Sequence, residues 1–98
     1  MRRDEALRIL KEHEGELRDR GVLHLRIFGS VARDEANAES DVDLLADFDP
    51  DRRMGLIALS SIQARLSEIV RAHVDLSSPG WLKPRVYERA SKEWVLAF

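Results

Sequence analysis

Two strands and the turn between them are encoded by residues 22–48, which read VLHLRIFGSVARDEANAESDVDLLADF. Residues 22–28 and residues 41–48 alternate between apolar and polar side chains, and a period of two predicts a β-strand. Gly29-Ser30 ends the first strand, and a short helical turn is expected to follow over residues 31–34. The apolar positions of the first strand that we expect to face the core are Leu23, Leu25 and Ile27.

The rest of the chain supplies helices and one further strand. Apolar residues recur with helical spacing in residues 3–19, 54–71 and 84–94. Residues 73–77 are expected to form a short strand. The order of these elements predicts a single α/β (α+β) domain over residues 1–98, with a small mixed β-sheet flanked by helices.

The C-terminal residues 94–98, WVLAF, are unusually apolar and leave two questions open. They either complete the preceding helix or form a short edge strand. They either pack into the core or contribute to a homo- or hetero-oligomer interface, because aromatic side chains are enriched at the centres of interfaces.

The composition excludes several kinds of protein. Sixteen Lys and Arg oppose eighteen Asp and Glu, for a net charge of −2, so we expect no strong nucleic-acid binding. The chain has no cysteine, which excludes disulfides and thiolate metal sites. The first residues are too charged for a signal peptide, and no apolar run approaches the roughly 20 residues of a membrane span. We therefore expect a cytoplasmic protein that does not interact with membranes.

A pair of acidic side chains lies at the start of the second strand. Asp41 and Asp43 are two residues apart, and such residues point to the same side of a strand. At ~4 Å their carboxylates repel by on the order of 4 kcal/mol at an effective dielectric constant near 20, so they require a raised pKa or a bound cation. Oxygen ligands favour Mg²⁺, with Mn²⁺ as the alternative. Asp75 is the natural third ligand if its strand pairs beside residues 41–48.

The turn at Gly29 and Ser30 is suited to binding an anion. Backbone N–H groups and the Ser30 hydroxyl can face a phosphate there, and Gly29 permits close approach to the backbone. Arg33 follows one helical turn after Ser30. Its guanidinium is placed either to neutralise phosphate charge or to lie on the helix surface.

The three histidines do not form a site of their own. They lie on separate expected elements as His13, His24 and His73. We expect surface or satisfied core residues at these positions. His73 shares a strand face with Asp75, which leaves a minor active-site role open.

Two motifs carry a family resemblance. The stretch FGSVAR at 28–33, followed by SDVDLL at 40–45, resembles the signature of the DNA polymerase beta-type nucleotidyltransferase superfamily. The stretch VDL at 74–76, followed by LKP at 82–84, is similar to the tail of its minimal, prokaryotic branch. The resemblance runs over nearly the whole chain and implies the nucleotidyltransferase fold.

The resemblance also implies a role for each residue of the motifs. Asp41 and Asp43 would bind the catalytic metals. Gly29 and Ser30 would hold the phosphates of a nucleoside triphosphate. Asp75 would be the third carboxylate, which in this family helps to activate the attacking hydroxyl.

Two residues depart from the family pattern. Asp34 stands where the family usually has glycine, and Trp81 replaces a residue that is commonly small or acidic. Asp34 is expected to add negative charge close to the phosphate turn. It would therefore weaken nucleotide binding rather than metal binding.

The minimal branch resembles antitoxins that are encoded beside HEPN-domain ribonuclease toxins. It implies Mg²⁺-dependent AMPylation, in which AMP passes from ATP to a tyrosine of the toxin and pyrophosphate is released. A chain of 98 residues is also expected to use a separate protein as acceptor. Two other hypotheses remain: nucleotidyl transfer to a small molecule or RNA, and a non-catalytic antitoxin that acts by occlusion.

Overall fold

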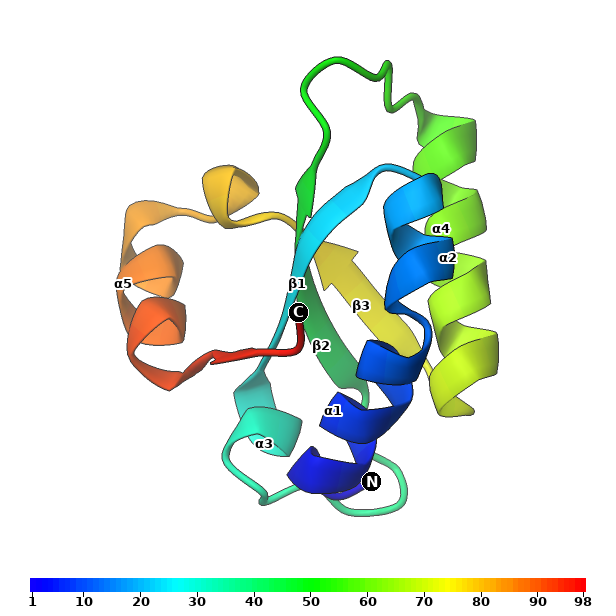
Figure 1. Cartoon of the computed structure of the whole chain (residues 1–98). Helices are drawn as coiled ribbons and strands as arrows, with labels where there is room; N and C mark the ends of the chain where they lie inside the picture. The colour runs from blue at the N-terminus through cyan, green and yellow to red at the C-terminus, as the bar shows by residue number, and fades with distance from the viewer.

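The computed structural model describes residues 1–98 and contains a four-stranded sheet with helices on both faces (Figure 1). The helices are α1 (Arg3–Glu12), α2 (Glu14–Asp19), α3 (Gly29–Ala32), α4 (Leu56–Val70), the 3₁₀ turn η1 (Pro79–Trp81) and α5 (Pro84–Glu93). The strands are β1 (Val22–Phe28), β2 (Val42–Phe48), β3 (Val74–Ser77) and β4 (Val95–Leu96). None of the helices has both the length and the apolar character of a membrane span. The predicted α/β class with a mixed sheet is confirmed.

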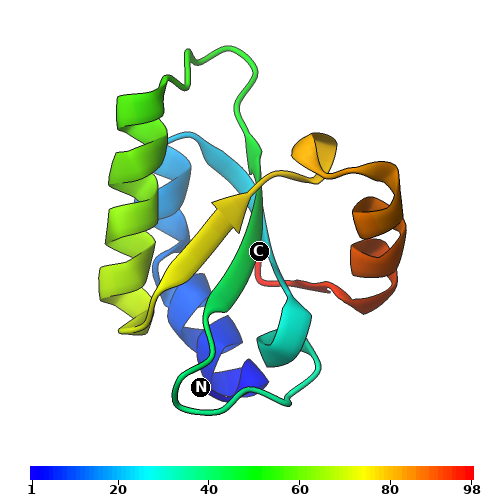
Figure 2. The same ribbon diagram turned by 180° about the vertical axis from the view of Figure 1, so that it is seen from behind.

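The strand order is β3-β2-β1-β4. β1 pairs antiparallel with β2 and with β4, whereas β2 pairs parallel with β3. The parallel pair is joined through α4, because parallel neighbours need a crossover connection. The end of β1 and the starts of β2 and β3 therefore lie at the same end of the sheet. The short helix α3 directly follows β1 at this end (Figure 2).

The hydrophobic core lies between the sheet and the helices α1, α2 and α4. These helices cover one face of the sheet, and α5 lies on the other side (Figures 1 and 2). Leu10 of α1, Leu44 of β2 and Leu66 of α4 are fully buried in one cluster. Each fully buried side chain of this kind contributes about 1.5–3 kcal/mol. This core holds β2 and β3 side by side, and with them the residues at their starts.

The sheet face beneath α5 contains a charged residue. Arg26 pairs in register with Leu45, which is fully buried. Nη1 of Arg26 lies 2.9 Å from Oδ2 of Asp47, but the angles do not make a hydrogen bond. The guanidinium lies 5.1 Å from the ring centre of Trp94, in cation–π range. This side of the sheet is therefore held partly by electrostatic contacts.

Two details of the N-terminal half differ from the sequence prediction. The single helix expected over residues 3–19 is broken at His13, whose Nδ1 lies 2.9 Å from the carbonyl oxygen of Ile9. In β1, Val22 is buried and Leu23 is only partly buried, because the pairing register with β2 shifts between Val22 and His24. A bulge of this kind moves side chains to the opposite face of a strand.

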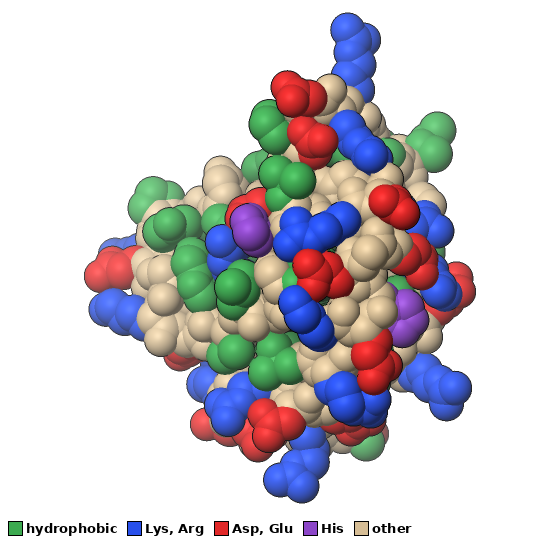
Figure 3. Space-filling view, in the orientation of Figure 1, with side chains coloured by type: hydrophobic (Ala, Val, Ile, Leu, Met, Phe, Trp, Pro, Cys, Tyr) green, Lys and Arg blue, Asp and Glu red, His purple; other side chains and the backbone are tan.

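The C-terminal segment forms an edge strand, which settles the first question left open by the sequence. In β4, Val95 and Leu96 pair with Ile27 and Arg26 of β1. Phe98 packs into the core and is 6% exposed, whereas Leu96 remains exposed. Hydrophobic side chains gather on the surface over α5 and this segment, and charges of both signs cover the side of α1, α2 and α4 (Figure 3).

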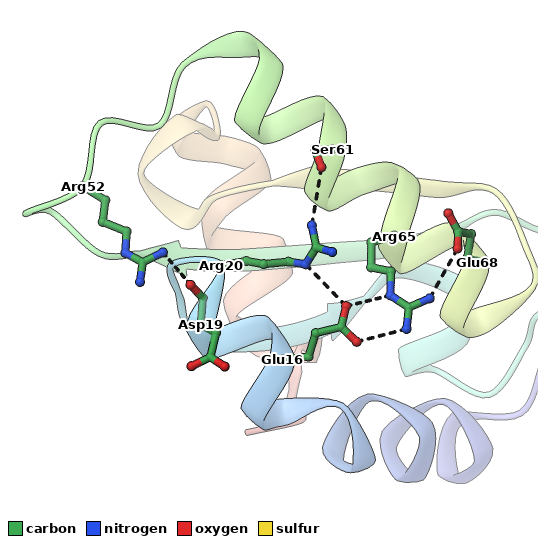
Figure 4. A network of polar contacts seen from close by, with 7 residues as sticks. All are labelled: Glu16, Asp19, Arg20, Arg52, Ser61, Arg65 and Glu68. Carbon is green, nitrogen blue, oxygen red and sulfur yellow. Dashed lines mark hydrogen bonds and ion pairs between the residues drawn. The ribbon is translucent and has the colours of Figure 1, made fainter.

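A polar network joins α2 to α4 (Figure 4). Arg65 donates two hydrogen bonds to Glu16, at 2.6 and 3.0 Å, and contacts Glu68 at 3.3 Å. The hydrogen bonds from Arg65 lower the pKa of Glu16 below its ordinary value. The stabilisation is therefore present above that ordinary value and is lost as the pH falls through the lowered pKa. Since both side chains remain partly exposed, at 33% and 34%, the network chiefly fixes the orientation of the two helices.

Asp34 has a structural role that the sequence does not reveal. Its backbone is left-handed, with φ 59°, so this position favours glycine, the residue that the family resemblance predicts here. Its Oδ1 accepts a hydrogen bond of 3.1 Å from the backbone N–H of Arg3, at the start of α1. No side chain within α1 caps this end. The carboxylate of Asp34 thus caps a helix 31 residues away in the sequence.

We expect Asp34→Ala to destabilise the fold by about 1–2 kcal/mol, because it removes a helix cap and leaves alanine in a left-handed conformation. Asp34→Gly loses only the cap and is expected to lie between alanine and wild type. Urea unfolding measures both values. Asp51→Ala, at an exposed position in a turn, is the control and should stay within about 0.5 kcal/mol of wild type. Equal stability of Asp34→Ala and the control would contradict the capping role.

Candidate active site

The pairing of β1, β2 and β3 brings the predicted site residues to one end of the sheet. Asp43 of β2 lies opposite Phe28 of β1 on one side and opposite Asp75 of β3 on the other. Gly29 directly follows Phe28 and therefore lies next to Asp43. Three segments that are separate in the sequence thus meet at this point.

The sequence predicted Asp41 to be the first residue of a strand over residues 41–48. In the structure it lies just before β2. β2 begins at Val42, whose N–H donates a 2.9 Å hydrogen bond to the carbonyl oxygen of His73. Nδ1 of His73 lies 3.4 Å from Oδ1 of Asp41 and 3.8 Å from Oδ1 of Asp75. The ligand atoms of these three exposed side chains lie within 4.8 Å of one another. The histidine that the sequence left open is therefore part of the cluster.

Gly29 is required by the close approach of Asp43. Its φ is +74°, a left-handed value that side chains rarely adopt. A Cβ built at this position would collide with Oδ2 of Asp43 and would lie 3.2 Å from its Cγ. The absence of a side chain at Gly29 therefore makes room for the carboxylate.

The electrostatic environment of Asp43 is strongly acidic. Burial raises the pKa of Asp43 above its ordinary value, and the neighbouring carboxylates of Asp75 and Asp41 raise it further. Arg33 offsets the pKa shift only in part. An incompletely neutralised group of oxygen ligands is the donor set that a hard divalent cation prefers, so these residues fit Mg²⁺ or Mn²⁺.

The phosphate turn lies at the start of α3. This helix covers Gly29–Ala32, whereas the sequence predicted a turn over residues 31–34. The first four N–H groups of a helix have no partner within it. The backbone of Gly29 and the half-exposed Ser30 thus present donors beside the carboxylate cluster.

Arg33 is engaged by two glutamates in this structure. Its Nε lies 3.0 Å from Glu35 and its Nη1 lies 3.0 Å from Glu93 of α5. Both bonds raise the pKa of the guanidinium, which stays charged. A phosphate at the turn would have to compete with these carboxylates for Arg33.

A cavity of about 290 Å³ lies between the phosphate turn and α5. It is lined by Phe28, Gly29, Arg33, Val86, Arg89, Ala90 and Glu93. Its lining combines apolar side chains with the charged Arg33, Arg89 and Glu93. A second groove of about 370 Å³ lies between α4 and Trp81, but it contains no titratable side chain, so it is not a candidate for catalysis.

The fold and the acidic site together define a nucleotidyltransferase. Residues 7–96 match the family described as the nucleotidyltransferase domain, and the chain belongs to this family. The chain is 34% identical over 93 residues to the protein adenylyltransferase MntA of Thermococcus cleftensis, which covers 94% of this chain and 92% of that protein. The family, the fold and the enzyme class expected from the sequence are therefore confirmed.

Solved structures show the same fold. One, assigned as a minimal nucleotidyltransferase, has a TM-score of 0.77 at 34% identity and covers 97% of this chain and 95% of that one. Another comes from the tri-AMPylated HEPN toxin of Shewanella oneidensis in complex with its MNT antitoxin. That match has a TM-score of 0.65 at 15% identity over 94% of this chain and 71% of that chain. An identity this low establishes a shared fold alone.

Proposed function

We propose that this chain transfers AMP from ATP to a hydroxyl group of a partner protein, with Mg²⁺ as cofactor and Mn²⁺ as the alternative. The observation that carries the proposal is that Asp43 pairs with Asp75 and packs against Gly29, while ligand atoms of Asp41 and Asp75 lie within 4.8 Å of each other. The raised pKa of Asp43 supports it, because the shift arises from burial of this carboxylate and, after that, from the neighbouring charges of Asp75 and Asp41.

The reaction is an in-line displacement at the α-phosphorus. The acceptor oxygen forms a bond to this phosphorus, and the bond from the phosphorus to the oxygen that bridges to the β-phosphorus breaks. Pyrophosphate leaves, and the hydroxyl proton passes to a carboxylate oxygen of Asp75. Divalent ions bound at the site would lower the pKa of the attacking hydroxyl and neutralise charge on the phosphates.

Each residue of the site has a distinct role in this proposal. Asp41, Asp43 and Asp75 hold the ions and thereby orient the triphosphate. The backbone N–H groups and the hydroxyl at Gly29-Ser30 bind phosphate oxygens. Arg33 adds positive charge once a phosphate replaces one of its glutamate partners. The cavity between this turn and α5 is suited to the nucleoside, because apolar and charged side chains both line it.

The acceptor is proposed to be a HEPN-domain toxin, which makes the chain the antitoxin of the pair. The Thermococcus relative is named a protein adenylyltransferase, and it aligns with nearly the whole chain. In the Shewanella complex the HEPN toxin is tri-AMPylated and bound to an antitoxin of this fold. Both observations support transfer to a protein. The cytoplasm is proposed as the site of action because the first residues are highly charged and the chain has no cysteine.

The proposal is tested with ATP labelled at the α-phosphate or at the γ-phosphate. The chain is incubated with Mg²⁺ and with the product of the neighbouring gene, which the proposal expects to be a HEPN-domain protein, and the products are separated. Label from the α-phosphate on the partner, without label from the γ-phosphate, is the expected result. Inhibition of the partner without label would favour occlusion, and label on RNA or a small molecule would favour the other acceptors.

A further inference from the structure

His73 is the one histidine that faces the acidic cluster. Nδ1 of His13 and Nδ1 of His24 each lie against a backbone carbonyl, that of Ile9 and that of Phe98. Nδ1 of His73 instead lies 3.4 Å from Oδ1 of Asp41 and 3.8 Å from Oδ1 of Asp75. Its side chain is 63% exposed, so packing does not account for its direction.

The backbone around His73 holds the imidazole at this place. The carbonyl oxygen of His73 accepts the hydrogen bond from Val42 that begins the β2–β3 pairing. His73 directly precedes β3, and its Nδ1 lies 3.8 Å from Oδ1 of Asp75, so the two side chains point to the same side. Asp41 directly precedes Val42, which places it across from His73. The three ligand atoms thus lie within 4.8 Å of one another, a spacing that one ion can span.

An imidazole changes the chemistry of a carboxylate site. Mg²⁺ strongly prefers oxygen ligands and retains several waters, whereas imidazole nitrogen suits first-row transition ions. Among these, Co²⁺ binds a given nitrogen-containing site more tightly than Mn²⁺ does. A site of two carboxylates and one imidazole can therefore bind Mg²⁺ through its oxygen atoms, but its nitrogen favours transition-metal ions.

We propose that His73 supplies a nitrogen ligand to a divalent ion shared with Asp41 and Asp75, and that this ligand shifts the preference of the site from Mg²⁺ toward Mn²⁺ and Co²⁺. The inference rests on the proposed function, because it takes Asp41 and Asp75 as metal ligands. His73 acts here as a residue that selects the metal. The three aspartates remain the residues that hold an ion of either kind.

The first test is pulsed electron paramagnetic resonance of Mn²⁺ bound to the full chain. We expect modulation from a coupled ¹⁴N nucleus that changes when the histidines carry ¹⁵N. The modulation is lost in His73→Gln and retained in His24→Gln, a matched control at an exposed histidine of β1. Bound Mn²⁺ without nitrogen coupling, or coupling that survives in His73→Gln, would overturn the inference.

The second test is calorimetric titration with Co²⁺ and with Mg²⁺. We expect His73→Gln to weaken Co²⁺ binding by about tenfold or more and to change Mg²⁺ binding by less than about threefold. Equal losses for both ions would overturn the selectivity. These outcomes are separate from the proposed function, which is tested by the transfer of α-phosphate label to the partner protein and by the dependence of that transfer on Asp43.

Discussion

We expect Asp43→Asn to abolish the proposed AMP transfer and at the same time to raise the melting temperature of the metal-free protein. Asp43 lies opposite Asp75 in the sheet, and its carboxylate packs against Gly29. Asparagine keeps its size but not its charge, so an ion loses a ligand and the triphosphate loses its orientation. We expect the rate of transfer of α-phosphate label to fall by about a thousandfold or more.

The gain in stability follows from the direction of the pKa shift. Because the pKa of Asp43 is raised on folding, the folded chain binds this proton more tightly than the unfolded chain does. Ionised Asp43 therefore opposes folding. Its destabilising effect is absent below the ordinary pKa of 3.8 and develops as the pH rises through the raised value. We expect Asp43→Asn to exceed wild type in melting temperature at neutral pH, and to equal it in acid.

Asp51→Asn is the control for both effects. Asp51 is an exposed acid that lies outside the cluster, so its loss should change neither the transfer rate nor the melting temperature. Added Mg²⁺ should stabilise wild type and this control, and should leave Asp43→Asn unchanged. Near-normal transfer by Asp43→Asn would remove Asp43 from the mechanism.

Gly29→Ala disrupts both the fold and the site. The backbone at this position has φ +74°, which is unfavourable by about 1–2 kcal/mol for alanine. The added methyl group would also collide with Oδ2 of Asp43 and push the carboxylate out of place. A displacement of about 1 Å at such a site lowers a rate by about a hundredfold. We therefore expect urea unfolding to show lower stability and the α-phosphate assay to show lower transfer.

Gly15→Ala provides the matched control for this substitution. Gly15 lies within α2, and a Cβ at this position would meet nothing within 4 Å. Because alanine favours helix over glycine, this variant should be more stable than wild type by up to about 1 kcal/mol, with full activity. If Gly29→Ala behaves like Gly15→Ala, the close packing between Gly29 and Asp43 does not matter.

Local patterns predicted the elements of this fold well. Alternation located β1 and β2, and helical spacing located α4 and α5 to within two residues. These patterns depend on neighbours in the chain and on one buried face. They failed where a distant partner decides the structure. The two-residue strand β4 exists because β1 offers it an edge, and the local sequence of residues 94–98 was compatible with a helix.

The site was predicted as a set of residues but not as an arrangement. The spacing of Asp41 and Asp43 is visible in the sequence, whereas the register that sets Asp43 against Asp75 depends on how α4 delivers β3. The same long-range register brings His73 to Asp41. The contact by which Asp34 caps α1 also joins segments that are distant in the sequence. The sequence led us to expect Asp34 only to add negative charge near the Gly29-Ser30 turn, and it did not indicate this hydrogen bond to Arg3.

The engagement of Arg33 could not have been foreseen from its own neighbourhood. Glu35 is close in the sequence, but Glu93 comes from the far end of α5. Spacing from Ser30 placed Arg33 correctly near the turn and gave no information on its competing partners. A long side chain can form ion pairs with any residue within its reach in the folded structure, and local sequence patterns do not describe these residues.

The central claim is that Asp41, Asp43 and Asp75 together hold divalent ions beside the Gly29-Ser30 turn. A crystal grown with Mn²⁺ and a non-hydrolysable ATP analogue tests it most directly, because anomalous scattering locates the ion. We expect an ion between the three carboxylates, with oxygen ligands at about 2.0–2.2 Å and the triphosphate on the turn. A bound analogue with no ion among these aspartates, or with Asp75 turned away from the other two, would contradict the claim.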